Sequence, residues 1–98
     1  MTREPDQLRL RLKQKMAFLA RTYQVESLGI FGSYARKEQN AQSDLDLLVT
    51  FTETPSLLRL IELENYLSDW LGIRVDLVMK DSLKPRVSDR VLTEVLPV

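Results

Sequence analysis

The stretch that decides the fold is DLDLLVTFT, residues 44–52 of a 98-residue chain. Successive side chains of a β-strand point to opposite faces, so the stretch divides into two sets. One set is entirely apolar and consists of Leu45, Leu47, Val49 and Phe51. The other set consists of Asp44, Asp46, Leu48 and Thr50. We therefore expect a strand with one face toward an apolar core and two neighbouring carboxylates on the other face.

The residues on either side predict helices and further strands. Apolar residues recur at helical spacing between Leu8 and Tyr23, and a β-branched, apolar run ends at Gly32. Ser56 is a suitable N-cap, and Gly72 a suitable C-terminal cap, for the helix between them. The expected elements are a helix over 5–23, strands over 25–31, 44–52 and 73–79, a short helix over 34–39, a turn over 40–43, a helix over 57–71 and a last helix.

The order of these elements predicts the fold class. The last helix is expected to be capped by Ser82 and to stop before Pro97. Three strands with one aliphatic face each favour an α+β fold, a small three-stranded mixed sheet with helices on one face. The length fits one domain, residues 1–98. The less covered face would carry the carboxylates.

Composition excludes several function classes. The chain has 14 basic and 14 acidic side chains and no net charge, which argues against direct binding of nucleic acid. It has no Cys and no His, which excludes disulfides, thiolate or histidine metal sites and a Ser-His-Asp triad. No apolar run approaches the roughly 20 residues of a membrane span, and the N-terminus lacks a secretory signal. We expect a cytoplasmic protein without a membrane partner.

Three acidic residues are candidates for a metal site. Asp44 and Asp46 are neighbours on one strand face, and Asp76 lies on the polar face of the strand over 73–79. Carboxylates that converge repel unless a cation lies among them, and Mg²⁺ or Mn²⁺ suits such oxygen ligands. Two ions could stabilise both the entering and the leaving oxygen of a phosphoryl or nucleotidyl displacement. The ordinary alternatives are solvated residues on an edge strand and, for Asp76, a surface ion pair.

A glycine and a serine follow the first expected strand. Gly32 permits close approach of the backbone to a phosphate, and the Ser33 hydroxyl adds a donor. The first amides of the expected short helix would favour an anion there, and Arg36 and Lys37 supply positive charge. The alternative is a plain strand–helix turn in which Ser33 is the N-cap. The spacing of a Walker A loop is absent.

Joined together, these motifs carry a resemblance to a known family. The run FGSYAR at 31–36, followed by SDLDLLV at 43–49, resembles the minimal nucleotidyltransferases (MNT proteins) of the DNA polymerase beta-type superfamily. The segment VDLV at 75–78 is similar to the family's third-carboxylate strand, and LKPR at 83–86 to its last helix. The resemblance covers nearly the whole chain and implies a polymerase beta palm-like nucleotidyltransferase fold.

The resemblance also implies roles for single residues. Gly32-Ser33 would hold the triphosphate of ATP, the implied substrate. Asp44 and Asp46 would bind two Mg²⁺ ions, for which Mn²⁺ is an alternative. Asp76 would help to bind one metal and would activate the acceptor hydroxyl.

Two basic residues in the motif are less clearly assigned. Arg36 lies within the family pattern and would either contact phosphate or brace the helix. Lys37 departs from the pattern, since many relatives carry Gly at this position. A Lys is well tolerated in a helix, so we expect no backbone strain at Lys37.

The resemblance implies a protein partner. Compact MNT proteins are paired with HEPN toxins, and the implied reaction transfers AMP from ATP to a tyrosine of the HEPN ribonuclease, which this antitoxin would bind as a hetero-oligomer. Candidate docking residues are Tyr34, Trp70 and the segment 96–98. Their alternative is core or edge packing, which we favour for Trp70.

Other functions remain open. One alternative is a non-catalytic antitoxin that neutralises its partner by occlusion. The intact Gly-Ser pair and the three Asp residues favour the enzyme, because occlusion requires none of them. A second alternative is transfer to a small hydroxyl-bearing molecule. The lack of a second domain to build a substrate pocket weighs against it.

Overall fold

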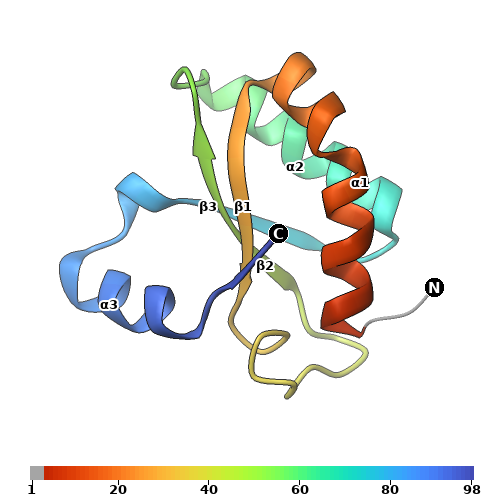
Figure 1. Cartoon of the computed structure of the whole chain (residues 1–98), viewed down its shortest axis with the longest axis vertical. Helices are drawn as coiled ribbons and strands as arrows, with labels where there is room; N and C mark the ends of the chain where they lie inside the picture. The colour runs from red at the N-terminus through yellow and green to blue at the C-terminus, as the bar shows by residue number, and fades with distance from the viewer. Residues whose placement is uncertain (1–3) are drawn as a thin grey trace.

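The computed structural model describes residues 4–98 and contains three α-helices, four strands and one short 3₁₀ helix in that range (Figure 1). The helices are α1 (Pro5–Tyr23), α2 (Leu57–Leu71) and α3 (Pro85–Glu94). The strands are β1 (Val25–Phe31), β2 (Leu45–Phe51), β3 (Val75–Met79) and β4 (Leu96–Pro97). The 3₁₀ helix η1 (Lys80–Ser82) follows β3 directly.

Local signals determine the ends of the two long helices. α2 begins after Ser56, whose side chain accepts a hydrogen bond from the Arg59 amide, and it ends at Gly72, whose φ is 69°. α1 has Pro5 in its first turn, where the missing amide costs nothing, and it ends at Gln24 in a left-handed conformation. The predicted bounds of α1, β1 and α2 are confirmed.

The third helix begins differently from the prediction. Ser82 does not cap α3, because its hydroxyl donates instead to the Met79 carbonyl within η1. α3 starts at Pro85 with Lys84 as a cap residue that provides no side-chain hydrogen bond. Proline favours this first helical position, since its φ is fixed near the helical value.

The sheet has four strands rather than the predicted three, in the order β3-β2-β1-β4. β2 runs antiparallel to β1 and parallel to β3, so the sheet is mixed as predicted. The additional strand β4 pairs antiparallel with β1 through Gly29–Pro97 and Ile30–Leu96. Pro97 lies in an edge strand, where its missing amide breaks no ladder between central strands.

The core lies between the sheet and the first two helices. Leu8, Leu12 and Leu19 of α1 and Leu63, Leu67 and Leu71 of α2 are buried with the aliphatic face of the sheet. The predicted core residues Leu45, Leu47 and Val49 are at most 1% exposed. These buried side chains provide the main hydrophobic stabilisation and align the strands beneath the helices.

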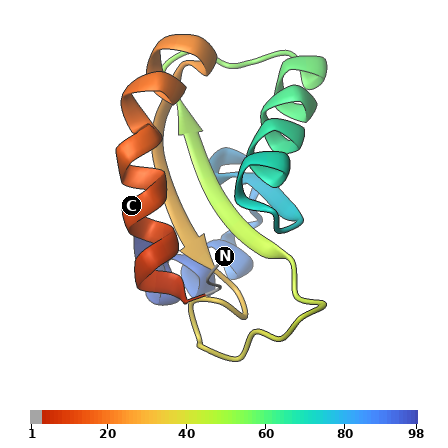
Figure 2. The same ribbon diagram turned by 90° about the vertical axis from the view of Figure 1, so that its right-hand side faces the viewer.

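The third helix departs from the predicted arrangement of all helices on one face. Figure 2 shows α3 behind the sheet, while α1 and α2 lie in front of it. Leu92 of α3 and the following Val95 line a pocket together with Gly29 and Leu48. Leu48 is the apolar residue in the otherwise polar set of β2 side chains, and this packing partner explains it.

The outer edge of β3 is secured by side chains of α2. The Ser68 hydroxyl accepts a hydrogen bond from the Val75 amide at 2.9 Å, and the Glu64 carboxylate accepts one from the Leu77 amide at 2.9 Å. These two amides point away from β2, since alternate residues of a strand bond to opposite sides. The strand that carries Asp76 is therefore held on both of its edges.

No helix within residues 4–98 is both long enough and apolar enough to cross a membrane.

Candidate active site

The site is built where β2 and β3 lie in parallel. Asp46 and Asp76 occupy the same register position, directly opposite each other. Side chains at paired positions point to the same face of a sheet, so both carboxylates leave the face that α1 and α2 do not cover. Asp44 precedes β2 by one residue, and its carboxylate forms a 3.9 Å ion pair with the exposed Arg74. The predicted proximity of the acidic side chains is thus set by strand register.

The charges at this position act on one another. The pKa of Asp46 is raised from 3.8 to about 6, chiefly by its burial and then by the neighbouring charges of Asp76 and Asp44. The positive charge of Arg36 opposes this increase, and the negative charge of Glu94 adds to it. An acid whose pKa is raised by two other carboxylates lies in a region with an excess of negative charge. Such a region attracts cations.

The candidate ligand atoms at this position are carboxylate oxygens, which suit a hard divalent cation. Carboxylate oxygens are the ligands that Mg²⁺ prefers, and no sulfur or imidazole competes, because the chain has neither Cys nor His. Within residues 4–98, no three acidic side chains are gathered closely enough to form a ready-made coordination sphere. The residues therefore fit such a cation by their chemistry and charge, and their side chains would need to converge on it.

The segment after β1 is a turn and not the predicted helix over 34–39. Residues 32–37 form successive hydrogen-bonded turns, in which the Arg36 amide donates to the Gly32 carbonyl at 3.1 Å and the Glu38 amide to the Ser33 carbonyl at 2.9 Å. The prediction of a helix N-terminus at Ser33 is wrong, and so is the role of that serine as a helix N-cap. Any anion here would meet turn amides without a helix dipole.

Position 32 requires a glycine because its backbone lies close to the Asp46 side chain. Its φ is 73°, a left-handed conformation that side chains other than Gly adopt at a cost. A Cβ atom on Gly32 would overlap the Oδ2 atom of Asp46. The glycine thus brings the start of the turn into direct contact with a carboxylate of the sheet.

The next two motif residues present polar groups at the surface of the turn. Within residues 4–98, neither the amide nor the hydroxyl of Ser33 forms a hydrogen bond. Arg36 donates from Nε to Glu38 at 2.7 Å and from Nη1 to Glu94. These two carboxylates raise the pKa of Arg36 further above its usual value. Ser33 is free to bind a ligand, whereas Arg36 is held in place.

Lys37 corrects an expectation of the sequence. Its φ is 58°, so the absence of backbone strain predicted for a helical Lys is wrong. The turn places this residue in the left-handed region, where a β-carbon is unfavourable. A Gly at this position would adopt the same conformation without that cost.

Sequence reasoning missed Glu94, the last residue of α3. Its Oε1 atom accepts a hydrogen bond from the Gly32 amide at 3.0 Å, and its two oxygens lie 3.3 and 3.2 Å from Nη1 of Arg36. Glu94 is 62 residues away from Gly32 in the chain, and no local pattern signals that contact. The position of Glu94 could have been predicted only from the pairing of β4 with β1, and that pairing was not predicted.

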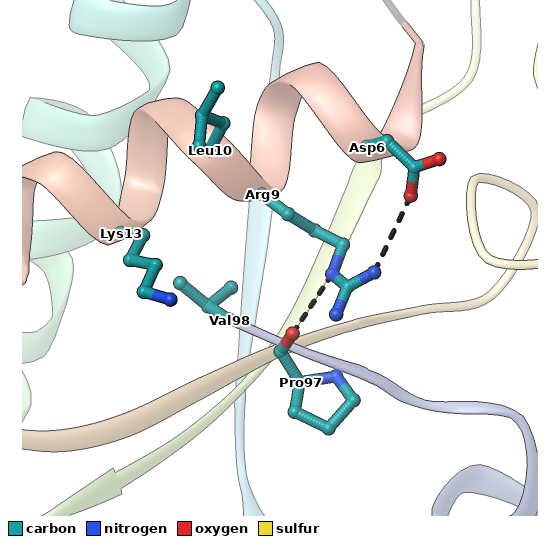
Figure 3. Close-up of a pocket in the computed structure, with 6 residues that line it drawn as sticks. All are labelled: Asp6, Arg9, Leu10, Lys13, Pro97 and Val98. Atoms are coloured by element: carbon teal, nitrogen blue, oxygen red, sulfur yellow. Dashed lines mark hydrogen bonds and ion pairs between the residues drawn. The ribbon is translucent and has the colours of Figure 1, made fainter.

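Two hollows on the surface differ in their relation to the acidic residues. One, of about 410 Å³, is lined by residues 41–44 and 72–74 and therefore borders Asp44. The other, of about 300 Å³, lies between α1 and the C-terminal strand, where Arg9 donates to the Pro97 carbonyl and pairs with Asp6 (Figure 3). None of the predicted site residues lines the hollow in Figure 3, so only the first is connected with the acidic site.

The three candidate docking positions have structural roles. Tyr34 is fully buried in the core, which excludes it as a surface docking residue. Trp70 is partly buried against the core, as favoured, and Arg11 and Lys15 lie over its ring at 4.9 and 4.8 Å. In the C-terminal segment, Leu96 packs against the core and pairs with Ile30 in the sheet.

The chain is similar in sequence to a set of known proteins. Residues 10–97 match the nucleotidyltransferase domain. Protein adenylyltransferase MntA of Thermococcus cleftensis is 54% identical over 80 residues, which are 82% of this chain and 81% of that protein. MJ0128 of Methanocaldococcus jannaschii is 55% identical over 73 residues, 74% of each chain.

Solved structures agree with the fold. A minimal nucleotidyltransferase structure superposes with a TM-score of 0.81 and 39% identity over 97% of this chain and 96% of that one. The crystal structure of a toxin–antitoxin with AMP-PNP gives a TM-score of 0.72 and 28% identity over 87% of this chain and 70% of that one. The predicted nucleotidyltransferase fold is therefore confirmed.

Proposed function

This chain belongs to the nucleotidyltransferase domain family, and from that premise we propose that it is an Mg²⁺-dependent antitoxin that transfers AMP from ATP to a tyrosine of a HEPN ribonuclease toxin. The observation that carries the proposal is the register of Asp46 opposite Asp76, with Gly32 in contact with Asp46. A protein adenylyltransferase and a toxin–antitoxin with an ATP analogue are among its relatives, which supports the choice of acceptor and nucleotide.

In this proposal the turn holds the triphosphate. The amide and hydroxyl of Ser33 donate to nothing within residues 4–98, and Arg36 of the same turn supplies a positive charge. Gly32 allows the phosphates to approach the backbone closely, because it has no side chain. Hydrogen bonds from the turn and the guanidinium would orient the α-phosphate toward the carboxylates.

Asp44, Asp46 and Asp76 would hold Mg²⁺ when the nucleotide is bound. The ion would supply charge neutralisation between the carboxylates and the phosphates, together with polarisation of the α-phosphate. The pKa of Asp46 is raised first by burial and then by the negative charges of Asp76 and Asp44, and it is this second part that a cation would compensate.

The acceptor hydroxyl would be delivered by the partner protein. Its oxygen would attack the α-phosphorus while the bond to pyrophosphate breaks, and its proton would pass to the Asp76 carboxylate. Asp76 suits this role because its strand is fixed by β2 on one side and by α2 on the other. The products would be pyrophosphate and a partner that carries AMP on the tyrosine oxygen.

The test uses the purified chain together with its proposed HEPN partner. With ATP and Mg²⁺, the partner's mass is expected to rise by one or more AMP units while its ribonuclease activity falls. The double variant Asp44→Asn/Asp46→Asn should still bind the partner and should leave its mass unchanged. A matched control is Asp69→Asn, which changes an exposed acid of α2 and should transfer AMP normally.

The same experiment separates catalysis from occlusion. If the double variant protects cells from the toxin as fully as the wild type does, and no mass shift occurs with either protein, neutralisation by binding alone replaces the proposed reaction. The requirement for Mg²⁺ is tested by chelating the ion with EDTA and then adding Mg²⁺ again. AMP transfer that persists in EDTA would contradict the role assigned to the carboxylates.

A further inference from the structure

We propose that Glu94 is a positioning residue of the nucleotide site, which holds the turn at Gly32 and orients Arg36 for the triphosphate. The inference rests on the proposed function, because Arg36 and the turn after Gly32 are its nucleotide-binding groups. Glu94 itself belongs to a different element, the end of α3, and lies outside the Gly-Ser and Asp motifs.

One carboxylate joins two parts of the turn. Oε1 of Glu94 accepts the Gly32 amide at 3.0 Å and also lies 3.3 Å from Nη1 of Arg36, while Oε2 lies 3.2 Å from the same nitrogen. Hydrogen bonds to an ionised acceptor are stronger than those between neutral groups. Glu94 therefore links the first residue of the turn to the guanidinium that follows four residues later.

The surroundings make this link a stiff one. The Glu94 side chain is 27% exposed, whereas the other partner of Arg36, Glu38, is 61% exposed. Solvent and salt screen an exposed pair more than a partly buried one, so the pair with Glu94 is screened less than the shorter 2.7 Å bond to Glu38. Just beyond Glu94, the Val95 side chain covers Gly29, where an added Cβ would lie 2.5 Å from its Cγ2. The end of α3 is thus packed directly on β1.

The pattern of contacts leaves the phosphate-facing groups available. Nε of Arg36 is engaged by Glu38 and Nη1 by Glu94, while Nη2 forms no hydrogen bond within residues 4–98. The amide and hydroxyl of Ser33 are also unengaged in this part of the chain. Glu94 accordingly orients the guanidinium through Nη1. It leaves Nη2 and the two Ser33 donors for the triphosphate.

A competing role predicts the opposite result. If Glu94 instead stood in the place of a phosphate on the Gly32 amide, its removal would free an anion site, and ATP would bind more tightly. A positioning role predicts weaker binding of ATP after the same change. The sign of the change in ATP affinity therefore decides between the two roles.

The experiment compares Glu94→Ala and Glu94→Gln with Glu38→Gln. Glu94→Ala is expected to raise both the Kd for ATP with Mg²⁺ and the KM for ATP in AMP transfer by about tenfold, as loss of charged hydrogen bonds implies. The value of kcat at saturating ATP should change much less. Glu94→Gln keeps an acceptor for the Gly32 amide, so its Kd and KM for ATP should lie between those of Glu94→Ala and those of the wild type. Glu38→Gln removes the exposed partner of Arg36 and should shift KM by less than about threefold.

A double-variant cycle separates positioning from general damage to the fold. In an Arg36→Ala background, Glu94→Gln should have little further effect on the KM for ATP, while thermal unfolding of each variant reports its folding. An unchanged or lower KM in folded Glu94→Ala and Glu94→Gln, with a wild type that transfers AMP, would overturn this inference alone. A wild type that neither binds ATP nor transfers AMP would overturn the proposed function as well.

Discussion

Gly32 lies so close to Asp46 that a methyl group on the glycine would overlap the aspartate Oδ2 atom. The turn after β1 and the acidic position on β2 are therefore a single packed unit. The phosphate-binding and acidic parts of the proposed site cannot move independently, because the contact leaves no space between them.

This contact makes Gly32→Ala the most disruptive small substitution in the turn. The left-handed backbone at φ 73° costs an Ala about 1–2 kcal/mol, and the overlap with Asp46 adds to this cost. We expect the free energy of unfolding in urea to fall by about 2–4 kcal/mol. The control Gly72→Ala, at φ 69° at the end of α2, measures the part of this loss that comes from the left-handed backbone. An equal loss in both variants would contradict the packing argument.

The raised pKa of Asp46 predicts a dependence of stability on pH. The pKa is about 6 in the folded chain and 3.8 ordinarily, so the folded state binds more protons between these values. The contribution of Asp46 to stability is therefore highest below about pH 4 and is lost as the pH rises through about 6.

Asp46→Asn should remove this dependence. At about pH 7.5 and without divalent cations, the variant should be more stable than the wild type by about 1–2 kcal/mol, after allowance for solvent screening. At about pH 4 the two proteins should unfold alike, because the wild-type carboxyl is then largely protonated. Urea titrations at both pH values provide the measurement. A constant difference across this range would mean that the charge of Asp46 is not its cause.

Lys37→Gly should stabilise the chain. Lys37 is exposed and has φ 58°, and Gly adopts this conformation without steric cost. Gly has more conformational entropy than Lys in the unfolded chain, which offsets part of the gain. We therefore expect the free energy of unfolding to rise by about 0.5–1 kcal/mol. The control Lys13→Gly, on the exposed side of α1, should instead destabilise by about 1 kcal/mol. A loss of stability in both variants would refute the strain assigned to Lys37.

Ser33→Ala should weaken ATP binding only in part. The hydroxyl contributes about 1.5–3 kcal/mol if it donates to a charged phosphate, and the amide of residue 33 remains. The fold should be unaffected, because the hydroxyl has no partner in residues 4–98. Isothermal titration with ATP and Mg²⁺ provides the measurement. Equal affinities for wild type and variant would remove Ser33 from the nucleotide site.

Glu64→Ala should loosen the strand that carries Asp76. It deprives the part-buried Leu77 amide of its acceptor, which costs about 1–3 kcal/mol. Faster hydrogen exchange is expected at Leu77, with a smaller change at the neighbouring central strand β2. Glu64→Gln retains an acceptor oxygen and should exchange nearly as slowly as the wild type. Unchanged exchange in Glu64→Ala would show that α2 does not hold this edge.

The sequence predicted those elements whose ends are coded locally. The caps at Ser56 and Gly72, and Pro5 in the first turn, bounded α2 and α1 correctly. The alternation in β2 also assigned the core face correctly, since Leu45 and Leu47 are fully buried. Within the site, it indicated that the three acids share one region, and the structure places Asp46 opposite Asp76.

Apart from the cap wrongly assigned to Ser82, the failures involve distant contacts. Ala35, Arg36 and Lys37 are good helix formers, yet the turn they form is fixed by contacts with Asp46 and Glu94, which are remote in sequence. β4 was missed because a strand of two residues that contains Pro97 has no periodic pattern. Glu94 was missed with it, because its position depends on the chain returning to β1.

The hydrogen bonds from α2 to the outer edge of β3 also bear on how the protein behaves at high concentration. An exposed strand edge with free amides is a template on which another chain can pair and aggregate. On β3 the outward amides of Val75 and Leu77 are already bonded to Ser68 and Glu64. The opposite edge ends in a strand of two residues, one of them proline. Both margins of the sheet are thus poor sites for strand addition, so copies of this chain should resist joining edge to edge.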